Sequence, residues 1–132
     1  FFKRTSTVFQ RYIGRDGSCY VEAHTVEAEE AIEVIHEAGG LAVLAHPRME
    51  DIRYTLPRLV PAGLDGVERY RKRCTRQIEE QVQTAAVYDK LFVTGGSDWH
   101  GRVSDDNFGT FAVPTDRLTA FLDKLQDCAY YQ

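Results

Sequence analysis

Two short segments of the sequence end in side chains that could bind a metal ion. Residues 91–94 form an apolar, β-rich run followed by Gly95 and Gly96, which predicts a buried strand that stops at a turn. Asp98 and His100 follow two positions apart, and in an extended chain both side chains would point to the same side. A carboxylate and an imidazole at a strand end suit zinc, manganese or iron, because these ions accept oxygen and nitrogen ligands.

The second segment is residues 41–45, another apolar run, which ends at His46. Pro47 comes next and excludes continuation of the strand in the interior of a sheet. Taken alone, either segment could equally be a strand that ends in an ordinary hydrogen-bonded polar residue. Two such strand ends in one short chain favour a shared site made of His46, Asp98 and His100.

The elements that would position these residues alternate along the chain. Apolar periodicity predicts helices at residues 7–13, 25–38, 51–60, 75–86 and 118–125, and strands at residues 41–45, 65–70 and 91–94. Thr25 and Thr75 are predicted N-caps, and Gly39 is a predicted helix end. The alternation predicts an α/β protein with a parallel sheet. The candidate residues follow the C-terminal strand ends, where such sheets and barrels carry their sites.

Length and composition limit the class of protein. A chain of 132 residues with 43% hydrophobic and 27% charged residues fits one globular domain, and no stretch approaches the roughly 20 apolar residues of a membrane span. We expect a soluble, cytoplasmic protein with three reduced cysteines, since none stands in a Cys-x-x-Cys pair. The net charge of −4 argues against a general nucleic-acid binder.

Because the chain starts at Phe1 without an initiator methionine, we expect a fragment, a processed product or the ordered part of something longer.

Five short motifs occur in the chain. They are Arg11-Tyr-Ile-Gly14 with Tyr20-Val21, Ile35-His-Glu-Ala-Gly-Gly40, Leu44-Ala-His-Pro47, Gly63-Leu-Asp-Gly-Val-Glu68 and Thr94-Gly-Gly-Ser-Asp-Trp-His-Gly101. In their order and spacing they resemble the C-terminal half of a PHP (polymerase and histidinol phosphatase) domain, of the type that hydrolyses nucleotide or RNA phosphate esters. This resemblance implies that residues 1–132 are a single domain, part of a (β/α)7 barrel, with residues 1–24 in the insertion and entrance region.

The resemblance also implies roles for single residues. The family's metal ligands correspond here to His46, Asp98 and His100, with manganese, zinc or iron as the ion. Glu68 matches a family glutamate that faces the barrel interior, and we expect it to orient a metal-bound histidine, although an exposed strand-end glutamate is the alternative. The family's N-terminal His-x-His motif has no counterpart in this chain. We therefore expect one weakly held metal here rather than the usual cluster.

A basic segment, residues 69–76, carries five positive charges in an otherwise acidic chain and leads to a predicted helix N-terminus. We expect Arg71 and Arg73, with Arg48 after the Ala-His-Pro motif, to attract a phosphorylated substrate such as a nucleotide or a short RNA or DNA end. A solvated basic loop is the alternative. Where the family has a histidine that is thought to touch the substrate phosphate, this chain has Cys74. A lone cysteine without a paired base is more often neither a ligand nor a nucleophile.

Two hypotheses follow for function. In the first, the parent protein is a metal-dependent phosphoesterase of the PHP type, and this chain alone is inactive or very weak because the N-terminal metal ligands are missing. In the second, the chain is a degenerate, non-catalytic half-barrel that binds a partner, a nucleotide or one metal and covers its open sheet edge by self-association. An unrelated α/β binding module would require accidental matches to all five motifs. His24 and His36 are expected to be structural or solvent-facing.

Overall fold

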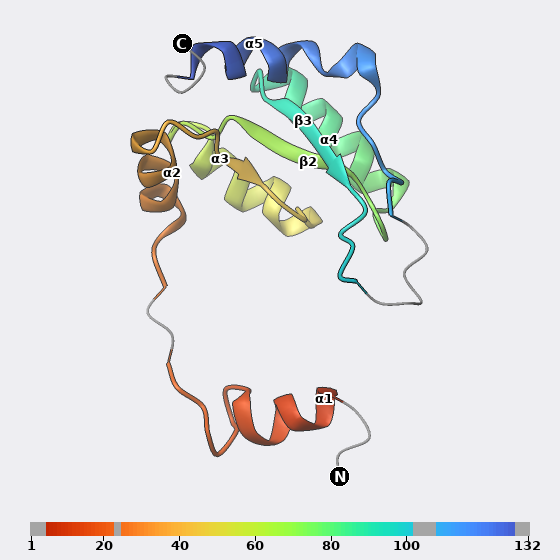
Figure 1. Cartoon of the computed structure of the whole chain (residues 1–132). Helices are drawn as coiled ribbons and strands as arrows, with labels where there is room; N and C mark the ends of the chain where they lie inside the picture. Colours follow the sequence, from red (N-terminus) through yellow and green to blue (C-terminus); the bar gives the residue numbers. More distant parts are fainter. Residues whose placement is uncertain (1–4, 23–24, 102–107, 129–132) are drawn as a thin grey trace.

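The computed structural model describes residues 5–22, 25–101 and 108–128, in which strands and helices alternate along the chain (Figure 1). The strands are β1 (Val43–Leu44), β2 (Gly66–Arg71) and β3 (Phe92–Gly96), parallel and in the order β1-β2-β3. The helices are α1 (Thr5–Val8), η1 (Phe9–Ile13), α2 (Ala28–Glu37), η2 (Asp51–Thr55), α3 (Leu56–Leu59), α4 (Arg76–Tyr88), η3 (Thr115–Arg117) and α5 (Thr119–Asp127). The predicted α/β class with a parallel sheet is therefore confirmed.

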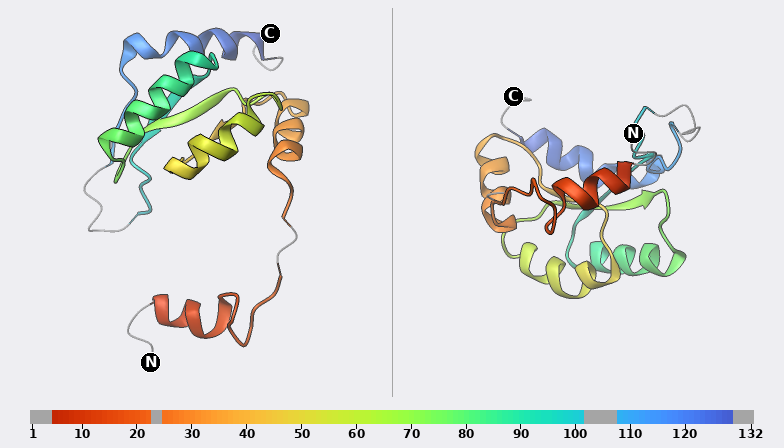
Figure 2. Two further views of the ribbon diagram at one scale, coloured as in Figure 1. Left: turned by 180° about the vertical axis from the view of Figure 1, so that it is seen from behind. Right: turned by 90° about the horizontal axis from the view of Figure 1, so that it is seen from below.

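One face of the sheet packs against helices and forms the hydrophobic core. Figure 2 shows α3 and α4 on one side of the sheet and α5 on the other. Leu44 pairs with Val67, and Val67 pairs with Val93, so these three side chains share the face that meets α3 and α4. Val67 and Val82 of α4 are completely buried. Burial of this apolar face is what fixes the strand register.

The opposite face of the sheet is held by an aromatic contact. The ring of Phe92 lies over Gly66, its partner across the strands, so closely that a Cβ atom on Gly66 would be 2.3 Å from the ring. The same ring meets Phe121 of α5 edge to face, with the centroids 5.2 Å apart. Gly66 thus leaves the space that lets Phe92 connect the sheet to α5.

A buried carboxylate joins the helices at the N-terminal ends of the strands. Asp65 accepts hydrogen bonds from the backbone N–H of Ala42 (2.9 Å) and from Lys124 Nζ (2.7 Å), and its Oδ2 lies 2.7 Å from His36 Nε2. These contacts connect α2, the start of β1 and α5 at one point. The prediction of a structural role for His36 is confirmed, whereas His24 lies outside the described residues.

Helix boundaries differ from the predictions at one end. Helix α2 begins at Ala28 with Glu27 in the N-cap position, where the backbone is still extended (φ −63°, ψ 149°), so the predicted cap at Thr25 is wrong. Thr75 does cap α4, because its hydroxyl oxygen accepts a hydrogen bond of 3.3 Å from the backbone N–H of Ile78. The predicted helix end at Gly39 is also confirmed, since Gly39 has the positive φ (76°) of a residue just past a helix.

Strand β3 does not stop where a turn was predicted. It continues through Gly95 and Gly96, which pair with Tyr70 and Arg71 of β2. A Cβ atom on Gly95 would lie 2.5 Å from the carbonyl oxygen of Phe111. The glycine therefore permits a close approach of backbone to the strand instead of ending it.

The N-terminal helices lie apart from the α/β body (Figure 1). Together α1 and η1 cover Thr5–Ile13, and the backbone N–H of Gly14 bonds to the carbonyl of Phe9, so the predicted short helix that stops at Gly14 is confirmed. Placement of residues 1–24 in an insertion region stays a prediction. Among the described residues, no helix has the length and apolar content needed to cross a membrane.

Candidate metal and phosphate site

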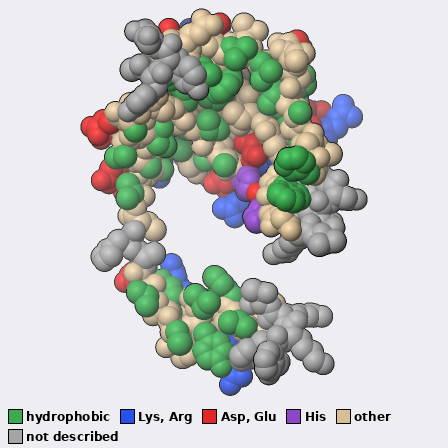
Figure 3. All heavy atoms as spheres, viewed as in Figure 1, with side chains coloured by type: hydrophobic (Ala, Val, Ile, Leu, Met, Phe, Trp, Pro, Cys, Tyr) green, Lys and Arg blue, Asp and Glu red, His purple; other side chains and the backbone are tan. Residues whose placement is uncertain are grey.

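The C-terminal ends of the strands bring His46, Glu68 and Asp98 together. The backbone N–H of His46 donates a hydrogen bond of 2.8 Å to Glu68 Oε2, and His46 Nε2 lies 3.5 Å from the same oxygen. His46 Nε2 is also 3.9 Å from Asp98 Oδ1. Figure 3 shows histidine and acidic side chains side by side at this edge of the body. Residues that are 52 positions apart in sequence therefore share one site.

The backbone is strained where two of these side chains emerge. His46 (φ 51°) and Asp98 (φ 50°) both adopt the left-handed conformation that non-glycine residues seldom occupy. The expectation of an extended chain through Asp98 and His100 is therefore wrong. Each left-handed residue turns the chain sharply just after its strand, and this turn directs the side chain toward the other strand ends.

The ring of His100 contacts the backbone of Asp98, whereas the sequence predicted only that the two side chains point to the same side. Its Nδ1 lies 2.6 Å from the carbonyl oxygen of Asp98 and 3.7 Å from Asp98 Oδ1. A carbonyl oxygen can only accept a hydrogen bond, so Nδ1 carries the proton in the neutral imidazole. The lone pair of His100 is then on Nε2, which is the form that binds a metal.

The donor atoms fit a divalent ion in chemistry and partly in spacing. Two imidazoles and a carboxylate suit zinc, manganese or iron, and two ligands of a tetrahedral ion stand roughly 3.4 Å apart. The distance of 3.9 Å between His46 Nε2 and Asp98 Oδ1 is only slightly longer. The 3.7 Å contact of Asp98 Oδ1 is to His100 Nδ1, the protonated nitrogen, and so does not measure the spacing of the metal-binding Nε2. Over the ranges that the structure describes, however, no three His, Cys, Asp or Glu side chains already surround one point. The three candidate ligands, each about half exposed, therefore do not form a closed metal site in this arrangement.

A guanidinium group lies beside these residues. Arg71, the last residue of β2, has a side chain only 13% exposed, and its Nη2 donates a 2.8 Å hydrogen bond to the carbonyl of Pro47. Its Nε is 4.0 Å from Glu68 Oε2, and this buried donor has no hydrogen-bond partner among the described residues. Such an unsatisfied charged donor is costly unless an acceptor joins it. Arg71 therefore places a positive charge beside Pro47 and Glu68.

The other two predicted anion contacts lie farther out. Arg48 directs its backbone N–H and its Nε to Asp51 Oδ2 (2.9 Å and 3.3 Å), and its side chain is 77% exposed. The backbone hydrogen bond from Arg48 is the main reason that the pKa of the Asp51 carboxyl is lowered. Arg73 is exposed in the turn after β2, where it has a φ of 61°. Arg71, by contrast, donates a hydrogen bond to the carbonyl of Pro47, the residue next to His46.

Comparison with known proteins shows which enzymes the chain is similar to. No family model matches the chain. Over 108 residues the chain is 38% identical to the phosphoribosyl 1,2-cyclic phosphate 1,2-diphosphodiesterase of Eggerthella lenta, covering 82% of this chain and 41% of that protein. Over 98 residues it is 38% identical to the 5'-3' exoribonuclease Rnm of Salmonella typhimurium, covering 70% of this chain and 33% of that protein. These relatives are phosphoesterases of the PHP family, and the chain is similar to part of their length.

The fold agrees with this assignment. The chain superposes with a TM-score of 0.71 and 26% identity on a proposed metal-dependent phosphoesterase from Bifidobacterium adolescentis, covering 93% of this chain and 45% of that one. The chain thus spans less than half the length of the relatives that it matches. The resemblance found in the sequence is confirmed, and the three-stranded sheet with its helices corresponds to part of a PHP barrel.

Cys74, at the position of a PHP histidine, does not take over a charged role. Burial is the main cause that raises the pKa of its thiol, and the nearby guanidinium of Arg71 offsets this only in part. At neutral pH the group is a protonated thiol, and thiols neither bind metals nor attack substrates well in that form. This state agrees with the interpretation of the sequence, in which Cys74 is more often neither a metal ligand nor a nucleophile.

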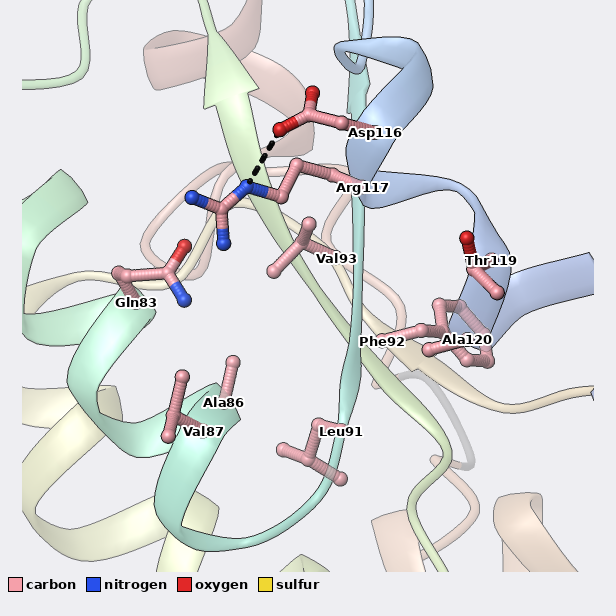
Figure 4. Close-up of a pocket in the computed structure, with 10 residues that line it drawn as sticks. All are labelled: Gln83, Ala86, Val87, Leu91, Phe92, Val93, Asp116, Arg117, Thr119 and Ala120. Carbon is pink, nitrogen blue, oxygen red and sulfur yellow. Dashed lines mark ion pairs between the residues drawn. The ribbon is translucent and has the colours of Figure 1, made fainter.

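A separate cavity lies away from these residues, between α4, β3 and the segment that joins η3 to α5 (Figure 4). Its volume is about 250 Å³, and its walls are largely apolar, with Val87, Leu91 and Ala120 among them. The charged side chains at its rim, Asp116 and Arg117, pair with each other at 3.5 Å. None of the predicted site residues lines this cavity.

Sequence reasoning missed two features. One lies at the opposite end of the sheet from the candidate site, and the other lies beside that site. The first is Asp65, whose partners stand 23, 29 and 59 positions away, so no local pattern could reveal them. The second is the side chain between the two proposed ligands, Trp99, which contacts Phe108. Its position between Asp98 and His100 was the signal that could have drawn attention to it.

Proposed function

We propose that the protein containing this chain is a metal-dependent phosphoesterase of the PHP type, acting on phosphate esters of nucleotides or short nucleic acids. The observation that carries this proposal is the approach of His46 and Asp98, from the ends of two non-adjacent strands, beside the buried guanidinium of Arg71. The names of the relatives, a cyclic phosphate diphosphodiesterase and an exoribonuclease, support the same reaction class.

The metal would be held by His46, Asp98 and His100. A divalent ion, when bound, supplies an activated water at neutral pH and neutralises charge on phosphoryl oxygens. Glu68 orients the first of these residues through the backbone, because it accepts the His46 backbone N–H. The carbonyl of Asp98 sets the tautomer of His100.

Arg71 would hold the phosphate. Its Nη2 is committed to the Pro47 carbonyl, which fixes the plane of the guanidinium next to the turn that carries His46. Its Nε is buried and stands 4.0 Å from Glu68 Oε2, so the guanidinium would attract the phosphate through its positive charge. The planar guanidinium of arginine suits phosphate better than the ammonium of lysine. Arg48 and Arg73 would add long-range attraction from the surface.

We further propose that the chain alone has little or no activity. The three proposed ligands are about half exposed, and no three ligand side chains surround one point within residues 5–22, 25–101 and 108–128. A tight metal site needs at least three protein ligands in fixed geometry. The missing ligands would come from the part of the PHP barrel that this chain does not cover.

The experiment measures hydrolysis of a chromogenic phosphodiester and of a short oligoribonucleotide with manganese. It compares the chain, a version extended at the N-terminus, and the extended Arg71→Lys variant. We expect turnover by the extended protein that a chelator abolishes, at least tenfold less by the chain, and a loss of about tenfold for Arg71→Lys. Arg58→Lys, which alters a surface ion pair with Glu29, is the matched control. Full activity in the presence of the chelator would contradict the proposal.

A non-catalytic binding module is the second candidate. It is favoured by the candidate ligands, which do not form a closed metal site among the described residues, and by β1, a strand of two residues whose Val43 is 36% exposed at the edge of the sheet. An exposed strand edge invites pairing with a second chain. Mass measurement in solution tests this candidate, because it requires a dimer of the chain and no phosphoesterase activity in the extended protein.

A further inference from the structure

Two large aromatic side chains are exposed beside the candidate metal site. Trp99 stands between the proposed ligands Asp98 and His100 in the chain and is 50% exposed, and Phe108 is 75% exposed. Their rings meet edge to face, with the centroids 5.3 Å apart and the planes at 64°. Figure 3 shows hydrophobic side chains directly beside the histidine and acidic side chains at this edge.

This aromatic pair contributes little to the hydrophobic core. The core is formed by buried residues on β1 to β3 and the helices against them, and neither ring belongs to it. Rings left in water forgo the free energy that burial would give. The edge-to-face contact nevertheless holds each ring in a defined orientation. Gly101 adds no side chain near the Trp99 ring, since even a Cβ atom there would lie 4.0 Å from the ring edge.

We propose that Trp99 and Phe108 form a stacking platform for a nucleobase. The proposal rests on the proposed function, because the phosphate of the same nucleotide would be held at His46, Asp98, His100 and Arg71. Trp99 is covalently flanked by two of these residues, so the platform cannot move far from the phosphate position. Aromatic rings bind bases through their faces with little sequence preference.

The extent of the platform also indicates the size of the ligand. It consists of one pair of rings, and the chain has a net charge of −4 instead of the broad positive surface that a long strand requires. One base next to one phosphate is the chemistry of a mononucleotide or the terminal nucleotide of a strand. The platform would thus favour nucleotides over sugar phosphates that lack a base.

The test uses the fact that Trp99 is the only tryptophan in the sequence, so its fluorescence reports on the platform directly. The chain is titrated with adenosine monophosphate, ribose phosphate and inorganic phosphate, and affinities are measured by calorimetry. We expect adenosine monophosphate to quench the fluorescence, ribose phosphate and inorganic phosphate to leave it unchanged, and adenosine monophosphate to bind about tenfold more tightly than ribose phosphate.

Variants separate stacking from phosphate binding. Trp99→Ala and Phe108→Ala should each weaken binding of adenosine monophosphate by about five- to a hundredfold and leave ribose phosphate binding unchanged. Tyr88→Ala removes another exposed aromatic side chain, 86% exposed on α4, and should change neither affinity. Because Phe108 is outside the helices and strands, its replacement also tests the idea if Trp99→Ala fails to fold.

Equal affinities for adenosine monophosphate and ribose phosphate, or variants that weaken both alike, would overturn the platform. Such a result leaves the phosphoesterase proposal intact if the extended protein still hydrolyses phosphodiesters. Conversely, quenching by adenosine monophosphate without any hydrolysis by the extended protein would support the platform and contradict the phosphoesterase proposal. The two proposals can therefore fail independently.

Discussion

The backbone N–H of His46 donates a 2.8 Å hydrogen bond to Glu68 Oε2, and the same carboxylate oxygen lies 3.5 Å from His46 Nε2. One side chain of β2 therefore holds the left-handed turn that presents the His46 imidazole. We expect Glu68 to act on the proposed metal through His46, as an orienting residue, and substitution tests this role.

Replacement of Glu68 should weaken metal binding without unfolding the protein. Glu68→Ala removes the acceptor of the His46 N–H and should lower manganese affinity by about 10- to 100-fold. Glu68→Gln retains an acceptor oxygen, so we expect a smaller loss. Calorimetric titration measures both, with Glu80→Ala, which alters an exposed ion pair on α4, as the control. Identical affinities for Glu68→Ala and the unaltered chain would show that Glu68 does not position His46.

Gly66 should tolerate no side chain. A Cβ atom there would be 2.3 Å from the Phe92 ring, and that ring is confined by Phe121. We expect Gly66→Ala to lower the free energy of unfolding by roughly 1–3 kcal/mol through overpacking. Gly96→Ala is the matched control, because Gly96 is also in a strand and a Cβ atom there would meet nothing within 4 Å. Equal denaturation midpoints for the two variants would contradict this packing.

Asp65 should make stability depend on pH in the acid range. Burial acts to raise the pKa of its carboxyl, but the hydrogen bonds from Lys124, His36 and the Ala42 N–H outweigh burial and leave the pKa lowered. A lowered native pKa stabilises the fold above the ordinary value near 3.9, and this contribution is lost as the pH falls through the native pKa.

We therefore expect Asp65→Asn to cost roughly 1–3 kcal/mol of unfolding free energy at neutral pH. The difference from the unaltered chain should shrink as the pH drops below about 4. Urea denaturation across this range measures it, with Asp123→Asn on the exposed side of α5 as the control. A difference that stays constant with pH would rule out the charge of Asp65 as the cause.

Cys74 should be unreactive at neutral pH. Its pKa is raised, mainly by burial, while Cys19 is exposed. Because the thiolate is the reactive form, we expect iodoacetamide to modify Cys74 at least about tenfold more slowly than Cys19. Mass spectrometry of the digested chain gives both rates, and in denaturant they should become equal. Fast modification of folded Cys74 would indicate an activated thiolate and reopen a role for it in the site.

Much of the fold was predictable because it follows from local patterns. The periodicity of residues 75–86 and the hydroxyl of Thr75 define α4 without reference to distant parts of the chain. The candidate site was predictable to the same extent, since parallel strands place their C-terminal ends at one edge of the sheet. His46 and Asp98 do approach each other there.

What the sequence did not reveal depends on contacts between distant residues. The left-handed conformations of His46 and Asp98 are imposed by the strand ends around them, and propensity alone would disfavour both. Gly95 stays in β3 because the Phe111 carbonyl approaches it, although local rules predict a turn. Arg71 was predicted to attract a phosphorylated substrate, but its hydrogen bond to Pro47, 24 positions away, and its low exposure could not be read from local patterns.

Manganese titration of four histidine and aspartate variants tests the central claim, a divalent ion shared by His46, Asp98 and His100. The variants are His46→Ala, Asp98→Ala, His100→Ala and, as a control at the other end of the sheet, His36→Gln. We expect each of the first three to lower manganese affinity by at least about tenfold, because each removes one ligand, and His36→Gln to leave it unchanged. Affinities for the first three that equal that of the unaltered chain would contradict the shared site.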